Sequence, residues 1–303
     1  MNGFAILFAI ILSKGSQGIF IDEGSPYADG PLEVAKLDIT VTTDTSPKHV
    51  QVFFPQGAGE FAVVYYVGGL NTLVLTELYS IFLSKLASHG LFVFGIDYYF
   101  PANTGQFEQD IDIYFKEFDF LRKYMANKTV GVPRWDHTGL LCHSSGCDVT
   151  LRMIESRRFP FQSSVFLEAF STLAHASSSL NFTIPALMYA TQLAYEGVPT
   201  CNIKGYGFEK FYSLWKCPRI KMEVADFGHC DILDPIGWEA CHISHFCKTS
   251  NSSRLNEYRQ AIQGICASFY VTMLQGRPDA VNYIIDEKKV PVKLLVHDSD
   301  WNC

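Results

Sequence analysis

The segment Gly139-Leu-Leu-Cys-His-Ser-Ser-Gly-Cys147 is the sequence feature that most constrains the fold. Its apolar run stops at Ser144, and residues 147–154 then have a helical pattern. A strand, a sharp turn and a helix predict a nucleophile elbow, which exposes a serine Oγ beside a backbone N–H that can bind an oxyanion. Such a turn needs small residues two positions before and after the serine. Gly146 meets this need and Cys142 meets it approximately; the alternative is a plain Ser-Gly loop.

Strand and helix patterns along the chain predict the architecture around this elbow. Residues 34–41 and 49–54 alternate as half-exposed antiparallel strands do. Continuously apolar strands follow at 61–67, 91–96, 138–142, 164–167, 186–190 and 220–225, and helical patterns occupy 76–89, 106–126, 147–156 and 254–276. We therefore expect an α/β protein: a mostly parallel central sheet with an antiparallel N-terminal start and helices on both faces. Functional groups then belong at the carboxyl ends of the strands.

Composition limits the classes of partner. The chain has 303 residues, of which 48% are hydrophobic, and no linker or repeat divides it, so we expect a single domain over residues 19–303. The formal charge of −7 gives no electrostatic reason to bind nucleic acid or an anionic membrane surface. We expect small or neutral partners and no cofactor or metal. The oligomeric state is left open.

The N-terminal residues resemble a secretory signal. Residues 1–12 are apolar but too short to span a bilayer, and Ser16-Gln-Gly18 offers the small residues that a signal peptidase recognises. We therefore expect a signal peptide over residues 1–18, no stable membrane insertion after its removal, and a secreted or lumenal protein; an uncleaved anchor is the alternative. Glycosylation sequons that support this route begin at Asn127, Asn181 and Asn251.

Nine cysteines in an exported chain imply disulfides and at least one unpaired thiol. We expect Cys142 and Cys147 to be buried thiols. Short loops favour the pairs Cys201–Cys217 and Cys241–Cys247, with Cys303 unpaired. A zinc site in the segment 241–247 is the alternative, but its ligand spacing is poor.

A serine hydrolase on this kind of sheet presents its triad in the order serine, acid, histidine. Among the histidines after Ser144, only His229 directly follows a strong strand, so we expect it to be the general base. Glu168 ends the strand after the elbow helix, and we expect it to be the acid because a buried carboxylate there needs a partner such as an imidazole N–H. Glu196, after the next strand, is the alternative acid. The loop that follows residues 61–67 supplies Gly69 as an oxyanion donor alongside Ser145.

These motifs resemble the chlorophyllase branch of the α/β-hydrolases, a group also similar to the plasma-type platelet-activating-factor acetylhydrolases. The resemblance runs from about Val34 to Gly276. Its marks are the segments 67–71, 86–97, 142–146, 184–193 and 225–234. The most specific is Ala225-Asp-Phe-Gly-His-Cys-Asp-Ile-Leu-Asp234, which is similar to the family segment that carries the catalytic histidine. Glu168 occupies the place of the family's acid.

The resemblance implies a serine hydrolase for a carboxylic ester with a large lipophilic part. The chain departs from the family pattern at three positions: Cys142 for Gly, Glu168 for Asp and Val67 for His. These departures motivate an alternative from another class, a secreted hydrolase-fold protein that binds a lipophilic ligand or a protein partner without catalysis. We expect pocket loops at 171–181 and 196–216, and the aromatic residues of 206–215 to line the pocket or to pack in the core.

Overall fold

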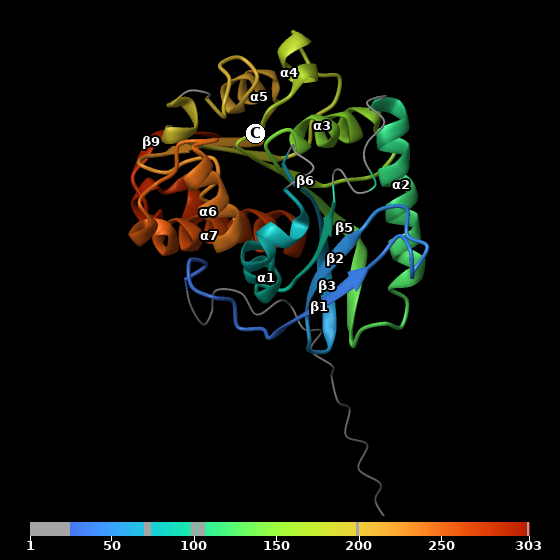
Figure 1. Cartoon of the computed structure of the whole chain (residues 1–303). Helices are drawn as coiled ribbons and strands as arrows, with labels where there is room; N and C mark the ends of the chain where they lie inside the picture. The colour runs from blue at the N-terminus through green and yellow to red at the C-terminus, as the bar shows by residue number, and fades with distance from the viewer. Residues whose placement is uncertain (1–24, 70–73, 98–100, 102–106, 198–199, 302) are drawn as a thin grey trace, which may run out of the picture.

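A computed structural model of the chain describes residues 25–69, 74–97, 101, 107–197, 200–301 and 303. The expected signal peptide, residues 1–18, lies outside the described residues. All strands belong to one sheet in the order β1-β2-β4-β3-β5-β6-β7-β8-β9 (Figure 1). Their bounds are β1 Val34–Ile39, β2 Val50–Pro55, β3 Gly59–Val67, β4 Leu91–Ile96, β5 Gly131–His143, β6 Ser163–Leu167, β7 Ala186–Thr191, β8 Arg219–Val224 and β9 Leu294–Asp300.

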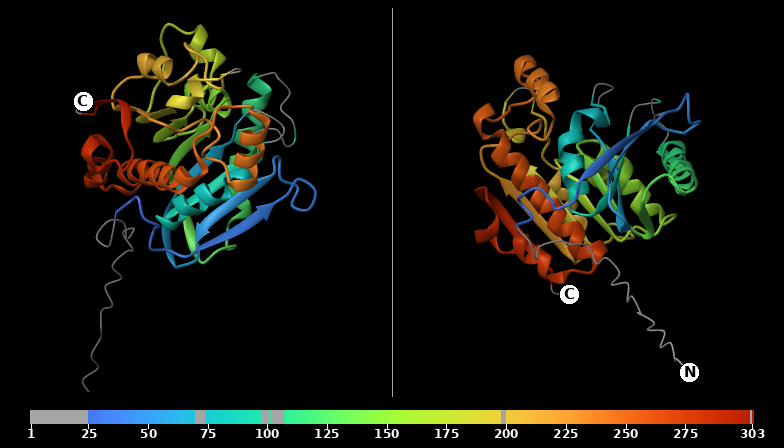
Figure 2. Two further views of the ribbon diagram at one scale, coloured as in Figure 1. Left: turned by 60° about the vertical axis from the view of Figure 1, so that its left-hand side comes forward. Right: turned by 90° about the horizontal axis from the view of Figure 1, so that it is seen from below.

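The sheet confirms the predicted fold class. Strands β4, β3, β5, β6, β7 and β8 pair in parallel, and β1 and β2 add the antiparallel start. A strand that the sequence did not predict, β9, pairs antiparallel with β8 and forms the other border, as the red strand in Figure 2 shows. The register places Val67 opposite Cys142, and His143 opposite Leu167, so the central strands end at one edge.

Helices cover both faces, as predicted. Their bounds are α1 Ser80–Ser88, α2 Phe107–Tyr124, α3 Gly146–Ser156, α4 Thr172–Ala176, α5 Phe208–Leu214, α6 Pro235–Ser244, α7 Leu255–Gln275 and α8 Asn282–Ile285. Figure 1 shows α1, α6 and α7 on one side of the sheet and α2 and α3 on the other. Within the described residues, no helix has the length and apolar character needed to cross a membrane. The predicted helix at 76–89 starts as a 3₁₀ turn, η1 (Thr76–Tyr79), before α1.

The two faces explain why the central strands are apolar at every position. Neighbours on β3, Tyr65 and Tyr66, are both fully buried but belong to different core clusters. The segments expected as pocket loops contain the short helices α4 and α5. In α5 and just after it, Phe211 and Trp215 pack against Phe166 of β6, with ring centroids 4.8 and 4.9 Å away. This part of the aromatic segment therefore packs in the core.

The cysteine predictions were largely wrong. The structure pairs Cys142 with Cys147, Cys201 with Cys247, Cys217 with Cys303, and Cys230 with Cys241. The two residues beside the elbow are therefore a disulfide and not free thiols, and neither predicted pair forms. The free cysteine is Cys266, buried in α7, where desolvation raises its thiol pKa. The prediction assumed that each disulfide closes a short loop, whereas two of the bonds join residues 46 and 86 positions apart.

Candidate active site

Ser144 lies where β5 turns sharply into α3. Its φ is +54°, a left-handed conformation that costs a non-glycine residue about 1–3 kcal/mol. The backbone around it is fixed: its N–H donates to Leu167 O at 2.9 Å, and its carbonyl accepts from the amides of Cys147 and Phe170 at 3.1 Å each. Between residues 138 and 151, Ser144 alone is not buried. The turn thus presents this serine at the surface of a rigid, buried segment.

Close packing and a disulfide hold the two arms of this turn together. A Cβ at Gly146 would lie 2.2 Å from the carbonyl oxygen of Gly68 and 2.6 Å from that of Val67, so only glycine fits there. Two positions before the serine, Cys142 bonds to Cys147 with a Cα–Cα distance of 5.1 Å. Both cysteines are fully buried. The cysteine that departs from the family pattern therefore serves to cross-link the strand to the helix.

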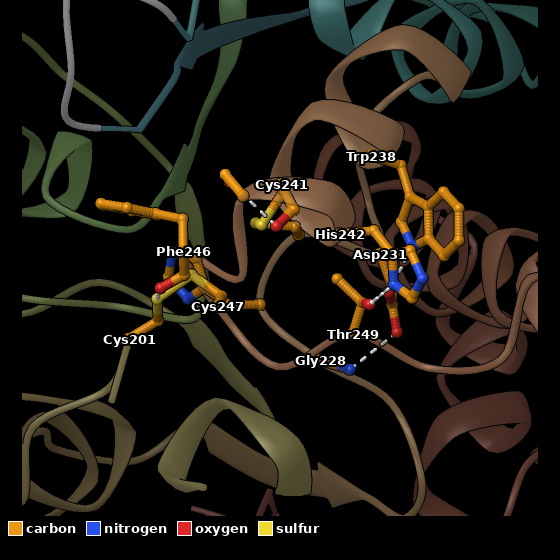
Figure 3. The surroundings of a disulfide bond; sticks show 12 residues. Cys201, Gly228, Asp231, Trp238, Cys241, His242, Phe246, Cys247 and Thr249 are labelled. Carbon is orange, nitrogen blue, oxygen red and sulfur yellow. Dashed lines mark hydrogen bonds between the residues drawn. A yellow bond between two sulfur atoms is a disulfide. The ribbon is translucent and has the colours of Figure 1, made fainter. Parts of the chain in front are cut away.

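His229 lies in the loop after β8 and is almost completely buried. Asp231 organises this loop: its carboxylate accepts from the Gly228 amide at 2.7 Å, from Trp238 Nε1 at 2.8 Å and from the Ser250 amide at 3.1 Å. Figure 3 shows Asp231 between Gly228 and Trp238. Burial raises the pKa of this carboxyl, and the hydrogen bonds oppose that rise. The residue next to the histidine, Cys230, is further tied to α6 by its disulfide.

Glu168 faces His229 from the end of β6. Its carboxylate oxygen lies 3.7 Å from His229 Nδ1, and its side chain is 1% exposed. This distance exceeds a hydrogen bond, although such bonds are often longer before substrate binds. The same oxygen accepts from Asn202 Nδ2 at 3.4 Å. The backbone of Glu168 also has a positive φ, +50°, and its amide donates to Tyr189 O at 2.8 Å.

The other carboxylates of this region face different partners. Glu196 is 40% exposed and forms an ion pair with Lys248. Asp148 accepts from Ser171 Oγ at 2.5 Å and from Arg152 Nε at 3.2 Å. Asp226 pairs with Arg254 at 3.0 Å. Of these four carboxylates, Glu168 is the one that lies beside the imidazole of His229.

The expected oxyanion donors lie on either side of Ser144. Ser145 is buried at the N-terminus of α3, where helix amides and the helix dipole favour negative charge. A Cβ built on Gly69 would lie 3.3 Å from Ser144 Cβ, so this glycine borders the nucleophile. The Gly69 amide donates to Tyr79 Oη at 3.2 Å. The loop at Gly69 is thus attached to a buried tyrosine beside the serine.

Sequence reasoning missed His143, Tyr79 and Asn202. The ring of His143 lies 4.6 Å from that of His229, centroid to centroid, and its Nδ1 is 2.9 Å from Tyr79 Oη. Burial, and then the neighbouring His229, lower the pKa of His143 well below its ordinary value, which favours the neutral imidazole. His143 is part of the elbow motif and could have been identified there. Tyr79 and Asn202 carry no sequence signal, because only the fold brings them to the site.

The sulfur atoms of Cys230, Cys241 and Cys247 lie within 4.8 Å of one another, which is close enough for a metal site. In the structure these sulfurs belong to two disulfides, Cys230–Cys241 and Cys201–Cys247. Figure 3 shows Cys201 and Cys247 near Cys241. The nearby His242 stacks on Trp238 with ring centroids 4.7 Å apart, and its Nδ1 lies 2.6 Å from Thr249 Oγ1. The residues of the alternative zinc motif are thus engaged in other interactions.

The comparisons with known proteins agree with the predicted resemblance. A family model described as chlorophyllase matches residues 23–155 and 168–300, which include Ser144, Glu168 and His229. Chlorophyllase-1 of Arabidopsis thaliana is 23% identical over 296 residues, which cover 89% of this chain and 88% of that relative. The predicted family is therefore confirmed. The chain belongs to the chlorophyllase family of α/β-hydrolases and is a carboxylic ester hydrolase.

Proposed function

We propose that the chain hydrolyses a lipophilic carboxylic ester through a Ser144–His229–Glu168 triad and an acyl-enzyme. Ser144 Oγ attacks the ester carbonyl while His229 takes its proton, and the same imidazole returns the proton to the leaving alcohol. Water then attacks the acyl-enzyme while His229 takes its proton, and the proton passes to Ser144 Oγ as the carboxylic acid leaves. Glu168 orients the imidazole through Nδ1. The Ser145 amide stabilises the oxyanion, and Gly69, the other expected donor, borders the serine with its N–H donated to Tyr79 Oη.

One observation carries this proposal: Ser144 lies in a strained, half-buried turn, and the ring of the preceding residue, His143, lies 4.6 Å from that of His229 in a buried glutamate–histidine pair. Taking a carboxylate out of water is costly unless it is paired, so a neighbouring imidazole that becomes positively charged stabilises the buried Glu168. A glutamate reaches one methylene further than the aspartate of the family pattern. The backbone of Glu168 has a positive φ of +50° at this position.

Two features support a lipophilic ester as substrate. The similar protein from Arabidopsis is named Chlorophyllase-1. Beside the nucleophile, the half-buried ring of Phe170 stacks on Tyr206 at 5.1 Å, and Tyr206 stacks on His175 at 3.8 Å. The Phe170 amide donates to the Ser144 carbonyl, so this aromatic stack adjoins the reacting serine. Stacked rings of this kind suit an apolar acyl or alcohol group.

We further propose that the protein is a secreted or lumenal glycoprotein, folded as a single domain over residues 19–303. Four disulfides are typical of an oxidising compartment. The sequon residues Asn127, Asn181 and Asn251 are all exposed, as a glycan requires. Residues 1–18, with their apolar block at 1–12, are then the signal that directs the chain there.

The test uses p-nitrophenyl ester turnover and fluorophosphonate labelling of purified protein. Ser144→Ala should lose both, and equal labelling of wild type and Ser144→Ala would remove Ser144 from the mechanism. Glu168→Gln should lower kcat by roughly 10⁴-fold, because the imidazole loses its tautomer and orientation. Glu196→Gln is the matched control and should remain near wild type, because Glu196 pairs with Lys248 at the surface. The reverse ranking would transfer the acid to Glu196.

A further inference from the structure

We propose that Tyr79 and His143 form a positioning pair that ties the loop at Gly69 to the catalytic imidazole of His229. This inference rests on the proposed function, because it assigns these two residues a role in the same reaction. Four groups form one continuous path: the Gly69 amide, Tyr79 Oη, the His143 ring and the His229 ring. The path joins the loop that borders the oxyanion position to the general base, without passing through substrate.

Chemistry fixes the direction of the first hydrogen bond in this path, and the direction of the second is part of the proposal. A backbone amide can only donate, so Tyr79 Oη accepts from Gly69 N at 3.2 Å. In the proposed pair, the phenol donates its own proton to His143 Nδ1, which lies 2.9 Å away. Nδ1 is then unprotonated, which requires the neutral tautomer of His143 with its proton on Nε2. Tyr79 thereby fixes both the loop backbone and the state of the second imidazole.

A neutral ring is what the base needs as a neighbour. His229 becomes positively charged during each proton transfer, and a second positive imidazole at 4.6 Å would oppose that charge. The pKa of His143 is already held low by burial and by His229. The hydrogen bond from Tyr79 to Nδ1 adds to this effect because it stabilises the neutral form. The pair therefore supports His229 both by packing and by keeping its surroundings uncharged.

Burial shows that both residues act through others. Tyr79 is 0% exposed and His143 is 3% exposed, so neither side chain reaches substrate from its place behind the serine. Gly69 lies against both side chains, since a Cβ built on it would lie 3.1 Å from His143 Nδ1 and 3.2 Å from Tyr79 Oη. The role of the pair is to position Gly69 and His229.

The first test removes the hydroxyl with Tyr79→Phe. We expect kcat for a p-nitrophenyl ester to fall roughly tenfold, the equivalent of one hydrogen bond, with KM changed less than twofold. Tyr65→Phe is the matched control: its phenol, on β3, is equally buried but belongs to the core on the opposite face of the sheet. Unchanged kcat in Tyr79→Phe, or an equal loss in Tyr65→Phe, would overturn the proposal.

A double-mutant cycle tests whether the two residues act as a pair. His143→Phe keeps an aromatic ring against His229 but cannot accept a hydrogen bond from Tyr79. If the residues act through this bond, Tyr79→Phe should lower kcat by a smaller factor in the His143→Phe background than in the wild type, because only the hydrogen bond to Gly69 is then left to lose. Multiplying effects in the double variant would show that the two residues act independently.

Nitrogen-15 NMR of histidine-labelled protein gives a readout that does not depend on turnover. Wild-type His143, assigned by its loss in His143→Phe, should show an unprotonated Nδ1 and a protonated Nε2, and Tyr79→Phe should show loss of this single tautomer. A protonated Nδ1 in the wild type would refute the hydrogen-bond direction. If wild type cleaves no ester, the proposed function fails, whereas the tautomer measurement still decides the arrangement of the pair.

Discussion

The disulfide across the elbow offers a quantitative test of how the strained serine is stabilised. Cys142 and Cys147 are 5 residues apart, and the loop-entropy relation for a ring of this size gives about 2 kcal/mol at 25 °C. The left-handed backbone of Ser144 inside that ring costs a similar amount, about 1–3 kcal/mol. The cross-link therefore offsets the strain that exposes the nucleophile. Cys217 and Cys303 are 86 residues apart, and the same relation gives about 4.6 kcal/mol for their bond.

The measurement is urea unfolding of Cys142→Ala, Cys147→Ala and the double variant, with the bond mapped by mass spectrometry under non-reducing conditions. Each single variant breaks the bond and removes one sulfur, whereas the double variant breaks the same bond and removes both. The sum of the single losses minus the double loss therefore isolates the bond from the buried sulfurs. We expect about 2 kcal/mol for this coupling and about 4.6 kcal/mol for the same cycle at Cys217 and Cys303.

The ranking of the two cycles is the critical result. The loop closed by Cys142–Cys147 spans 5 residues and that closed by Cys217–Cys303 spans 86. A coupling at the elbow equal to or larger than that between Cys217 and Cys303 would therefore refute the entropic argument. A coupling near zero at the elbow would show that the bond does not constrain the turn. In that case the packing of Gly146 against Gly68 would have to hold Ser144 alone.

Two further predictions concern Asn202 and His89. Asn202→Ala removes the amide that donates to Glu168 Oε2 at 3.4 Å, and we expect kcat to fall roughly tenfold, far less than in Glu168→Gln; wild-type turnover would contradict this role. Burial lowers the pKa of His89 from 6.5 to about 4, so the unfolded chain protonates first and stability is lost as pH falls from 6.5 through 4. His89→Gln should reduce the pH dependence of the unfolding free energy in that window by up to about 1.4 kcal/mol per pH unit. The measurement is urea unfolding of wild type and variant at pH 7 and pH 5, and an equal change in unfolding free energy for the two proteins would contradict the prediction.

The sequence determined most of the sheet and the position of the elbow. Strands such as residues 61–67 and 91–96 are apolar at every position because helices cover both faces, and that pattern is local. β9 escaped prediction because it is an edge strand whose second half, His297 to Asp300, is polar. The elbow was recognisable because the turn itself demands Gly146, whose Cβ would strike the neighbouring strand.

The tertiary structure alone decided which distant residues meet. The disulfide partners could not be read from loop length, because Cys217 and Cys303 are brought together only when β9 pairs with β8. Glu168 and Glu196 both follow strands, and the sequence could only rank them. The fold sends one to His229 and the other to Lys248. Local patterns fix strands and turns, because those depend on neighbours in the chain. Pairs of side chains depend on the sheet order, which is set by the whole chain at once.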